Sequence, residues 1–184
     1  MDATLEPNES RYVLKVERRL AQPPERVWRA VTDRELLKQW FPCDVEGDWT
    51  VGAGLRFEFL QGEGEGLSEE ELRGEVLALE EPRLLEFRWG TDVLKYELTS
   101  DGDGCLFRLS HSFDDPSWGA RNAAGWEMCI ENLDLLLEGV GLVKFAAKVW
   151  KTKFSRYVAK FEPTHGPQEG PPESDQRLAE DAEA

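Results

Sequence analysis

The sequence has few of the residues on which metal sites and disulfide frameworks depend. Its 184 residues include two histidines and three cysteines, and the cysteines (Cys43, Cys105 and Cys129) are far apart. It has no Cys-x-x-Cys motif and no histidine cluster, so neither a zinc site nor a disulfide scaffold is predicted. We therefore expect a cytoplasmic protein that needs no metal and no cofactor.

Long apolar runs and basic residues are also scarce. No segment approaches the ~18 consecutive apolar residues that a membrane helix needs, and residues 1–10 are acidic rather than apolar, unlike a signal peptide. Lys and Arg total 22 against 37 Asp and Glu, a formal net charge of -15. Nucleic-acid binding requires a basic surface, so we expect neither a nucleic-acid binder nor an integral membrane protein.

Aromatic residues, in contrast, are plentiful. They make up 10 % of the chain and include seven tryptophans, enough apolar area for the core of one domain. The acidity lies mainly at the two ends of the chain, residues 1–10 and 163–184, and in one insertion, residues 63–75. We predict a flexible N-terminus over 1–10, a folded domain over 11–162 and a disordered acidic tail over 163–184, which is rich in Pro and Gly and has no aromatic residue.

Period-two alternation dominates the first part of the domain. A strand ending at Leu20 is followed by two short helices, the second capped by Asp33, and then by an antiparallel meander of five or six strands. A flexible acidic loop is predicted at Gln61–Gly66. The inward-facing positions of the meander are Leu55, Phe57, Phe59, Leu85, Phe87, Trp89, Leu94, Tyr96, Leu98, Phe107, Leu109, His111 and Phe113.

Helical periodicity begins after Pro116. A long helix is predicted over about 117–138, with Trp126, Ile130, Leu133 and Leu137 on one apolar stripe. A second helix is predicted over about 143–161. It is amphipathic, and it contains six basic residues and no acidic residue before Glu162.

These elements predict an α+β fold in which the curved antiparallel sheet wraps around the long helix, because one apolar sheet face needs a helix laid across it. The order of elements and several short motifs then carry a resemblance to a known family. The motifs are Ala21-x-Pro-Pro-Glu-x-Val-Trp-x-Ala-Val-Thr-Asp33, Trp40-Phe41, Gly54-Leu-x-Phe57, Gly74-Glu-Val76, Pro82-x-Leu-Leu-Glu-Phe87, Gly125-Trp126 with Leu133, and Trp150-x-x-x-Phe-x-x-Tyr-Val-x-x-Phe161. Together they resemble the START/SRPBCC helix-grip superfamily, and within it the bacterial branch related to the activator of the heat-shock-protein-90 ATPase.

The resemblance implies a binding site for a small apolar or amphipathic molecule between the sheet and the long helix. The residues expected to line it are Phe57, Phe59, Phe87, Trp89, Tyr96, His111, Asn122, Trp126, Ile130 and Leu133. Aromatic side chains at strand spacing also form ordinary cores, so the sequence leaves open whether a cavity is present or filled.

Three alternatives remain open at this level. His111 is either a hydrogen-bonded structural residue, with Tyr96 and Asn122 as candidate partners, or a group that orients a ligand or transfers protons as in cyclase-like or hydrolytic relatives. The name of the related activator suggests a protein-interaction module, with a chaperone or regulator as client. The basic helix either docks on the body, forms a homodimer or partner surface, or lies on anionic lipid.

Overall fold

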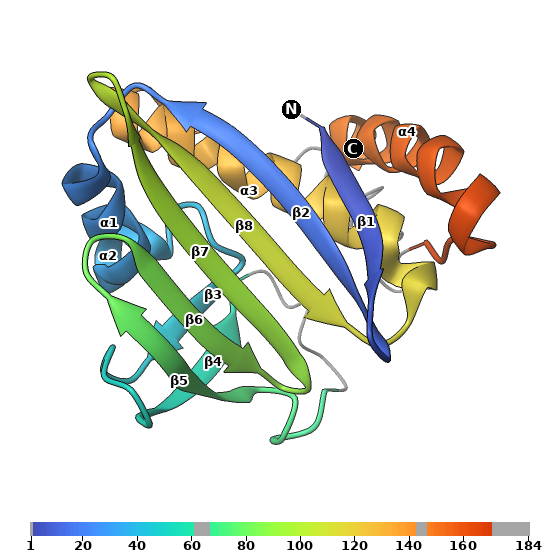
Figure 1. Ribbon diagram of the computed structural model, residues 1–184, viewed down its shortest axis with the longest axis horizontal. Helices are drawn as coiled ribbons and strands as arrows, with labels where there is room; N and C mark the ends of the chain where they lie inside the picture. The colour runs from blue at the N-terminus through green and yellow to red at the C-terminus, as the bar shows by residue number, and fades with distance from the viewer. Residues whose placement is uncertain (1, 61–66, 143–146, 171–184) are drawn as a thin grey trace.

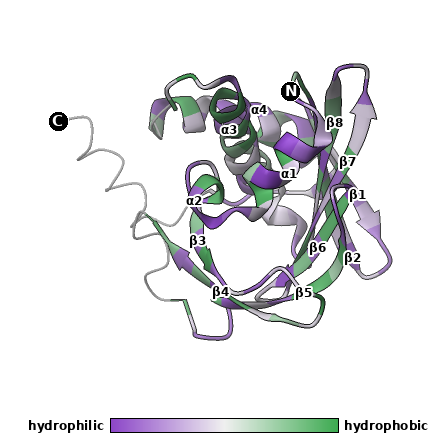
Figure 2. Ribbon diagram, turned by 90° about the vertical axis from the view of Figure 1, so that its left-hand side faces the viewer, coloured by the Kyte–Doolittle hydropathy of each residue, from purple (hydrophilic) through white to green (hydrophobic). Residues whose placement is uncertain are grey.

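One antiparallel sheet of eight strands carries the helices on its concave side (Figures 1 and 2). The computed structural model describes residues 2–60, 67–142 and 147–170. The strands are β1 (Ala3–Asn8), β2 (Arg11–Leu20), β3 (Cys43–Glu46), β4 (Gly54–Phe59), β5 (Arg73–Glu80), β6 (Leu84–Trp89), β7 (Asp92–Asp101) and β8 (Gly104–Phe113). The helices are α1 (Pro24–Thr32), α2 (Arg34–Leu37), a 3-10 turn (Pro116–Trp118), α3 (Gly119–Glu138) and α4 (Ala147–His165).

The strand order across the sheet is β1-β2-β8-β7-β6-β5-β4-β3. The first long strand, β2, therefore joins the far end of the meander by pairing with β8, where Leu14 lies opposite His111. The sheet therefore curves around α3 with β1 and β3 as its edges. The predicted helix-grip α+β fold is confirmed. The sheet has more strands than predicted, because β1 and β3 add an edge strand at each side.

Local signals in the sequence set the helix boundaries. Proline at positions 23 and 24 fixes the backbone at the start of α1. The Asp33 carboxylate accepts hydrogen bonds from the backbone N–H groups of Glu35 and Leu36, as predicted for a cap of α2. Helix α3 ends at Gly139, whose φ of 71° is the left-handed conformation that glycine adopts without strain.

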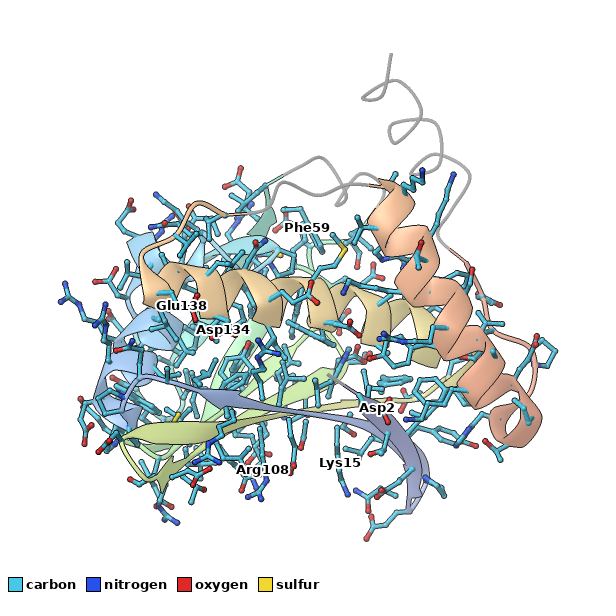
Figure 3. All side chains as sticks on the ribbon, turned by 90° about the horizontal axis from the view of Figure 1, so that it is seen from above. Asp2, Lys15, Phe59, Arg108, Asp134 and Glu138 are labelled. Carbon is cyan, nitrogen blue, oxygen red and sulfur yellow. The ribbon has the colours of Figure 1, made fainter. Side chains whose placement is uncertain are left out.

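The alternation predicted for the meander is confirmed by burial. The inward positions of β7 and β8 are buried, whereas Arg108 and Lys15 project from the outer face of the sheet. Figure 3 shows these two side chains pointing away from α3, while Phe59 lies on the side that carries the helix. On α3, Trp126, Ile130, Leu133 and Leu137 are buried, as the predicted stripe requires.

The prediction of a flexible N-terminus over 1–10 is wrong. Residues Ala3–Asn8 form β1, which pairs with β2 and lies beside α4 (Figure 1). Ala3 and Leu5 are buried. The Leu5 side chain packs against the backbone of Gly119, where an added Cβ would lie 2.6 Å from Leu5 Cδ2 and 3.4 Å from Phe161 Cδ2. Leu5 is thus enclosed between the start of α3 and the end of α4.

The predicted boundary between domain and tail also needs correction. Helix α4 continues through Pro163 to His165 rather than ending near 161, and the chain then folds back onto the start of α3. The Gln168 side-chain oxygen accepts a hydrogen bond from Ala120 N at 2.9 Å, and Glu169 N donates to Ser117 O at 2.8 Å. Gln168 supplies an acceptor for one of the N–H groups that a helix start leaves without an internal partner. The predicted loop at 61–66 and residues 171–184 of the predicted tail lie outside the described residues.

Truncating Leu5 tests the structural role of β1. We expect Leu5→Ala to lower the free energy of unfolding by about 3 kcal/mol, because it empties a buried site between two helices. Urea denaturation followed by circular dichroism measures the change. Leu60→Ala is the matched control, since Leu60 is 48 % exposed and its truncation is expected to cost less than about 0.5 kcal/mol. Equal effects of the two variants would contradict the enclosed position of Leu5.

Candidate functional site

Aromatic side chains cover the concave face of the sheet from β4 to β8. Neighbouring rings contact one another across the strands, with centroid separations of 6.0 Å for Phe57 and Phe87, 5.6 Å for Phe87 and Tyr96, and 5.5 Å for Tyr96 and Phe107. We call this group, with the rings that pack on it from the segment after α2, the β3–β4 connection and α3, the aromatic cluster. Its members are Trp40, Phe41, Trp49, Phe57, Phe59, Phe87, Trp89, Tyr96, Phe107 and Trp126.

The cluster contains the predicted aromatic lining residues and four others that were not predicted to line the site, namely Trp40, Phe41, Trp49 and Phe107. Phe41, directly after α2, is central to it: its ring lies 5.7 Å from Trp126 of α3 and 5.5 Å from Trp89 of β6. Phe41 therefore joins the helix to the sheet. Trp40 and Trp49 complete the layer next to Tyr96 and Phe87.

Because Gly74 has no side chain, the two rings nearest to it can make the tightest ring contact in this layer. Phe57 and Trp89 are stacked at 4.9 Å with an interplanar angle of 18°. A Cβ on Gly74 of β5 would lie 2.8 Å from Phe57 Cε2 and still closer to the Arg88 carbonyl oxygen. Glycine at this position lets the Phe57 ring lie directly over the strand.

One side of the cluster reaches solvent. Phe59 and Trp89 are half-buried, whereas Phe57, Phe87 and Tyr96 are at most 1 % exposed. The Phe59 and Trp89 rings lie 5.6 Å apart. Together they form an aromatic rim that leads from the surface through the stacked Phe57 ring to the buried part of the cluster.

His111 of β8 lies beside Trp126, and its partners differ from those predicted. Trp126 Nε1–H donates to His111 Nδ1 at 3.0 Å, and His111 Nε2 lies 2.8 Å from Asp92 Oδ2. Tyr96 and Asn122, the predicted partners, make neither contact. Asp92 in turn lies 3.5 Å from Arg11 Nη2. Trp126, Asp92 and Arg11 come from three separate elements, α3, β7 and β2, so no local spacing in the sequence could reveal them.

This geometry fixes the form of the histidine ring. An indole N–H can only donate, so Nδ1 must be the unprotonated acceptor and Nε2 must carry the proton that Asp92 accepts. Both ring nitrogens are thereby occupied by protein groups. His111 is left with no free nitrogen to take a proton from a ligand, and the arrangement favours its structural role over its catalytic one.

Asn122 is the predicted lining residue that the structure sets apart from the rings. It is half-buried on α3, one turn before Trp126. Ile130 and Leu133, further along α3, are fully buried beneath the helix. The nine other predicted residues thus share one layer between the sheet and α3, and Asn122 lies at its margin.

Several bases of helix α4 form ion pairs with the rest of the protein. Lys153 Nζ lies 2.7 Å from both Glu127 Oε1 and Glu131 Oε1 on α3, and Arg156 pairs with the other Glu127 oxygen. Tyr157 donates to Glu127 Oε2 at 2.6 Å. Further along the helix, Lys160 lies 2.6 Å from Asp2.

These contacts answer part of the question about the basic helix. Trp150, Tyr157 and Phe161 are buried, so the helix docks on the body of the protein. Three of its bases pair with acids of α3 and the N-terminal segment, which leaves Lys148 and Lys151 on its outer face among the described residues. The support for an anionic-lipid surface is correspondingly weaker. No helix in the described part of the chain is long and apolar enough to span a membrane.

Glu127 is the buried centre of this charge group. Burial acts to raise the pKa of its carboxyl, but the hydrogen bonds from Lys153 and Tyr157 and the nearby positive charges outweigh burial, so the pKa lies below its ordinary value. Lys153 is affected in the reverse direction: burial acts to lower its pKa, and the two glutamates raise it overall. Both shifts stabilise the charged pair in the folded state.

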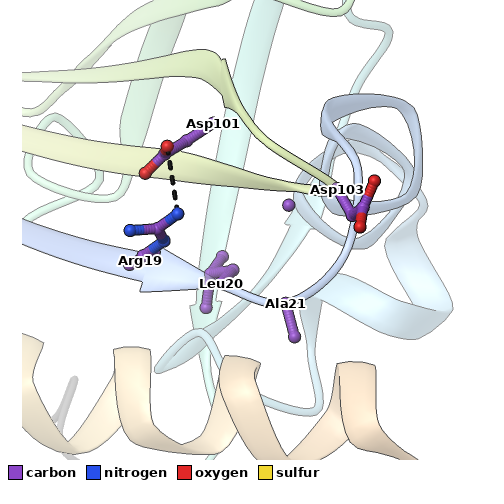
Figure 4. A pocket seen from close by; sticks show the side chains of 6 residues that line it. Arg19, Leu20, Ala21, Asp101 and Asp103 are labelled. Carbon is purple, nitrogen blue, oxygen red and sulfur yellow. Dashed lines mark hydrogen bonds and ion pairs between the residues drawn. The ribbon is translucent and has the colours of Figure 1, made fainter.

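A surface hollow of about 470 Å³ lies away from the aromatic cluster. It is lined by Arg19, Leu20, Ala21, Asp101, Asp103 and Gly104, where the end of β2 meets the turn between β7 and β8. Figure 4 shows Arg19 reaching Asp101, with 3.1 Å between Nη2 and Oδ1. The hollow contains none of the predicted lining residues and is open to solvent.

Comparisons with known proteins agree with this geometry. A family model described as activator of Hsp90 ATPase homolog 1-like protein matches residues 21–138. The structure is similar to that of CalU16 from Micromonospora echinospora, with a TM-score of 0.65 and 21 % identity over 86 % of this chain and 96 % of that one. It is also similar to EF2215 from Enterococcus faecalis, described as a conserved protein of unknown function (TM-score 0.69, 18 % identity, 88 % and 91 % covered).

A further similar structure is DynU16, described as a putative protein in the dynemicin biosynthetic locus. Its TM-score is 0.59 at 26 % identity, over 72 % of this chain and 48 % of that one. No curated protein matches the sequence.

The His111 tautomer is directly measurable. In ¹⁵N NMR spectra of the neutral ring we expect Nδ1 to give the shift of an unprotonated nitrogen and Nε2 that of a protonated one, since Trp126 can only donate. Trp126→Phe should move the Nδ1 signal because it removes the donor, whereas Trp118→Phe should not, since Trp118 is 44 % exposed on the 3-10 turn. A proton on Nδ1 in the wild-type protein would contradict the assigned hydrogen bonds.

Replacing Glu127 tests the attachment of α4. The folded pKa of Glu127 is lowered, so its stabilisation is present above its ordinary pKa near 4.5 and is lost as the pH falls through the lower folded value. At pH 7 we expect Glu127→Gln to lower the free energy of unfolding by about 2 kcal/mol, because Lys153 and Arg156 lose a buried partner. Between pH 5 and pH 3 (roughly one unit either side of an ordinary carboxyl pKa), the wild type should lose more stability than the variant.

The matched control for this change is Glu131→Gln. Glu131 is 42 % exposed, and its ion-pair partner within the described part of the chain is Lys153, so its replacement should cost well under about 1 kcal/mol. Urea denaturation at each pH supplies the free energies. Equal losses in the two variants would mean that burial of Glu127 contributes nothing to the docking of α4.

Proposed function

The chain belongs to the family of activator of Hsp90 ATPase homolog 1-like proteins, and from this premise we propose that it binds a small apolar or amphipathic molecule between the sheet and α3. The proposed contact residues are those of the predicted lining set, with Phe41 and Trp49 added. Binding, rather than chemistry, is the proposed role. His111, the candidate proton-transfer group of this layer, has both ring nitrogens hydrogen-bonded to Asp92 and Trp126.

The observation that carries the proposal is the aromatic rim formed by Phe59 and Trp89. Fully packed cores bury their large rings, yet these two remain half-buried while their neighbour Phe57 is fully buried. A surface aromatic pair that continues inward through stacked rings is the kind of lining that ligand sites present. An entering molecule would replace ring–ring contacts with its own and would lose its hydration there.

The charge pattern indicates what kind of molecule fits. The rings from Phe57 to Tyr96 offer apolar surface, and the charged pairs described above lie on α4, at His111 and on the outer face of the sheet. Burying a charge without a partner is costly. A neutral molecule, or one whose charged end remains at the Phe59–Trp89 rim, is therefore the expected ligand.

The neutral fluorescent probe N-phenyl-1-naphthylamine tests the proposal. We expect its fluorescence to rise on binding and Trp89→Ala to weaken its affinity by about tenfold, because the variant removes one ring of the rim. Trp118→Ala is the matched control: it makes the same change at an exposed tryptophan of the 3-10 turn, and should leave the affinity unchanged.

Two further measurements separate loss of binding from loss of fold. Thermal unfolding shows whether Trp89→Ala remains folded at the assay temperature, and Phe59→Ala provides a second change at the same rim. Resonances of Phe59, Tyr96 and Trp126 should shift on titration of the wild type with the probe. No probe binding, or binding that shifts only residues outside the aromatic cluster, would overturn the proposed function.

A further inference from the structure

The aromatic cluster contains one buried polar atom that the protein leaves without a partner. Among the described residues, the buried side-chain atoms with no hydrogen-bond partner are Arg11 Nε, Ser117 Oγ and the Tyr96 hydroxyl. The first two lie near the ends of β2 and the 3-10 turn. Tyr96, 1 % exposed, is in the middle of the cluster. A buried hydroxyl with no partner destabilises the folded state, so its retention needs a reason.

The indole N–H groups of the tryptophans around Tyr96 have hydrogen-bond acceptors within the protein. Trp40 Nε1–H donates to Ala30 O at 2.9 Å, and Trp49 Nε1–H donates to Thr32 O at 2.7 Å. Trp126 Nε1–H has His111. The fold thus provides an acceptor for each of these indoles, and the Tyr96 hydroxyl is an exception in the same layer.

The position of Tyr96 directs its hydroxyl toward the layer between sheet and helix. Its ring projects from the concave face of β7 and lies among Trp40, Phe87 and Phe107. The titratable groups that act on the phenol are the thiols of Cys129 on α3 and Cys43 on β3. The hydroxyl therefore lies between elements on both sides of the layer, where a molecule bound beneath α3 would meet it.

We propose that the Tyr96 hydroxyl is the specificity-determining group of this site and donates a hydrogen bond to an oxygen of the ligand. The ligand class is a neutral apolar molecule with a carbonyl oxygen on its frame. This inference rests on the proposed function and adds the one polar contact that orients the molecule among the rings.

Two physical arguments set this chemistry. Burial raises the pKa of Tyr96 well above its ordinary value, so the phenol remains protonated and available as a donor at neutral pH. A charged acceptor would need a counter-charge in the layer, and the groups acting on Tyr96 are thiols rather than bases. A carbonyl oxygen accepts a hydrogen bond without requiring a counter-charge.

A matched pair of probes tests the inference. Fluorene and 9-fluorenone share a planar frame and differ in one carbonyl group. Wild-type protein should bind fluorenone about tenfold more tightly than fluorene, the scale of one hydrogen bond formed in a dry site. Tyr96→Phe should remove that preference by weakening fluorenone alone. Tyr12→Phe makes the same change on half-buried Tyr12 of β2, beside His165, and should keep the preference.

The stability of the unliganded protein provides a second readout. Replacing a tyrosine whose hydroxyl is hydrogen-bonded inside the fold normally lowers stability. We expect Tyr96→Phe instead to raise the urea midpoint of the free protein, because it removes a buried hydroxyl with no partner. A lower midpoint would show that the protein itself satisfies the hydroxyl, and would overturn the inference.

The outcomes separate this inference from the proposed function. If N-phenyl-1-naphthylamine binds at the cluster but wild-type protein does not prefer fluorenone, or Tyr96→Phe weakens both probes equally, Tyr96 is not the selecting group and the binding function stands. If no probe shifts a resonance of the cluster, the binding function itself fails.

Discussion

One apolar sheet face and the single helix that covers it determine most of this structure. The concave face from β4 to β8 carries rings at alternate positions, and such a face is stable only when removed from water. Helix α3 lies across it, and Trp126, Ile130 and Leu133 complete the layer. Both the Phe41 ring and the His111 imidazole contact Trp126, and through it they fasten the helix to the sheet. The other helices and the edge strands are arranged around this contact.

A second side of α3, next to the apolar stripe, contacts helix α4. On this side Glu127 and Glu131 of α3 face α4, and Lys153 Nζ lies 2.7 Å from a carboxylate oxygen of each. Glu127 lies at 3 % exposure within this interface, so its charge requires partners. Lys153, Arg156 and Tyr157 provide them, which explains two of the bases on this helix.

Periodicity was sufficient to predict the inward positions of the meander and the stripe on α3, because both depend on local spacing alone. It failed at β1, because the strand has only two buried apolar residues, Ala3 and Leu5, in an otherwise mostly polar segment. It also failed for the partners of His111. Asp92 and Trp126 reach the ring from different elements, and it takes both the sheet register and the packing of α3 on the sheet to bring them together. Glu127 was missed for the same reason, since an acidic residue in a helix looks solvent-exposed until the helix that covers it is placed.

The polar groups of the inner layer therefore fall into two kinds. The indoles of Trp40, Trp49 and Trp126 and the imidazole of His111 are bonded within the protein, and each fixes one element against another. The Tyr96 hydroxyl fixes nothing and costs stability where it lies. Phenylalanine would fill the same space at no such cost. The indoles and the imidazole of this layer are bonded within the protein, so a tyrosine at the point where the proposed ligand would be oriented is explained better by function than by packing.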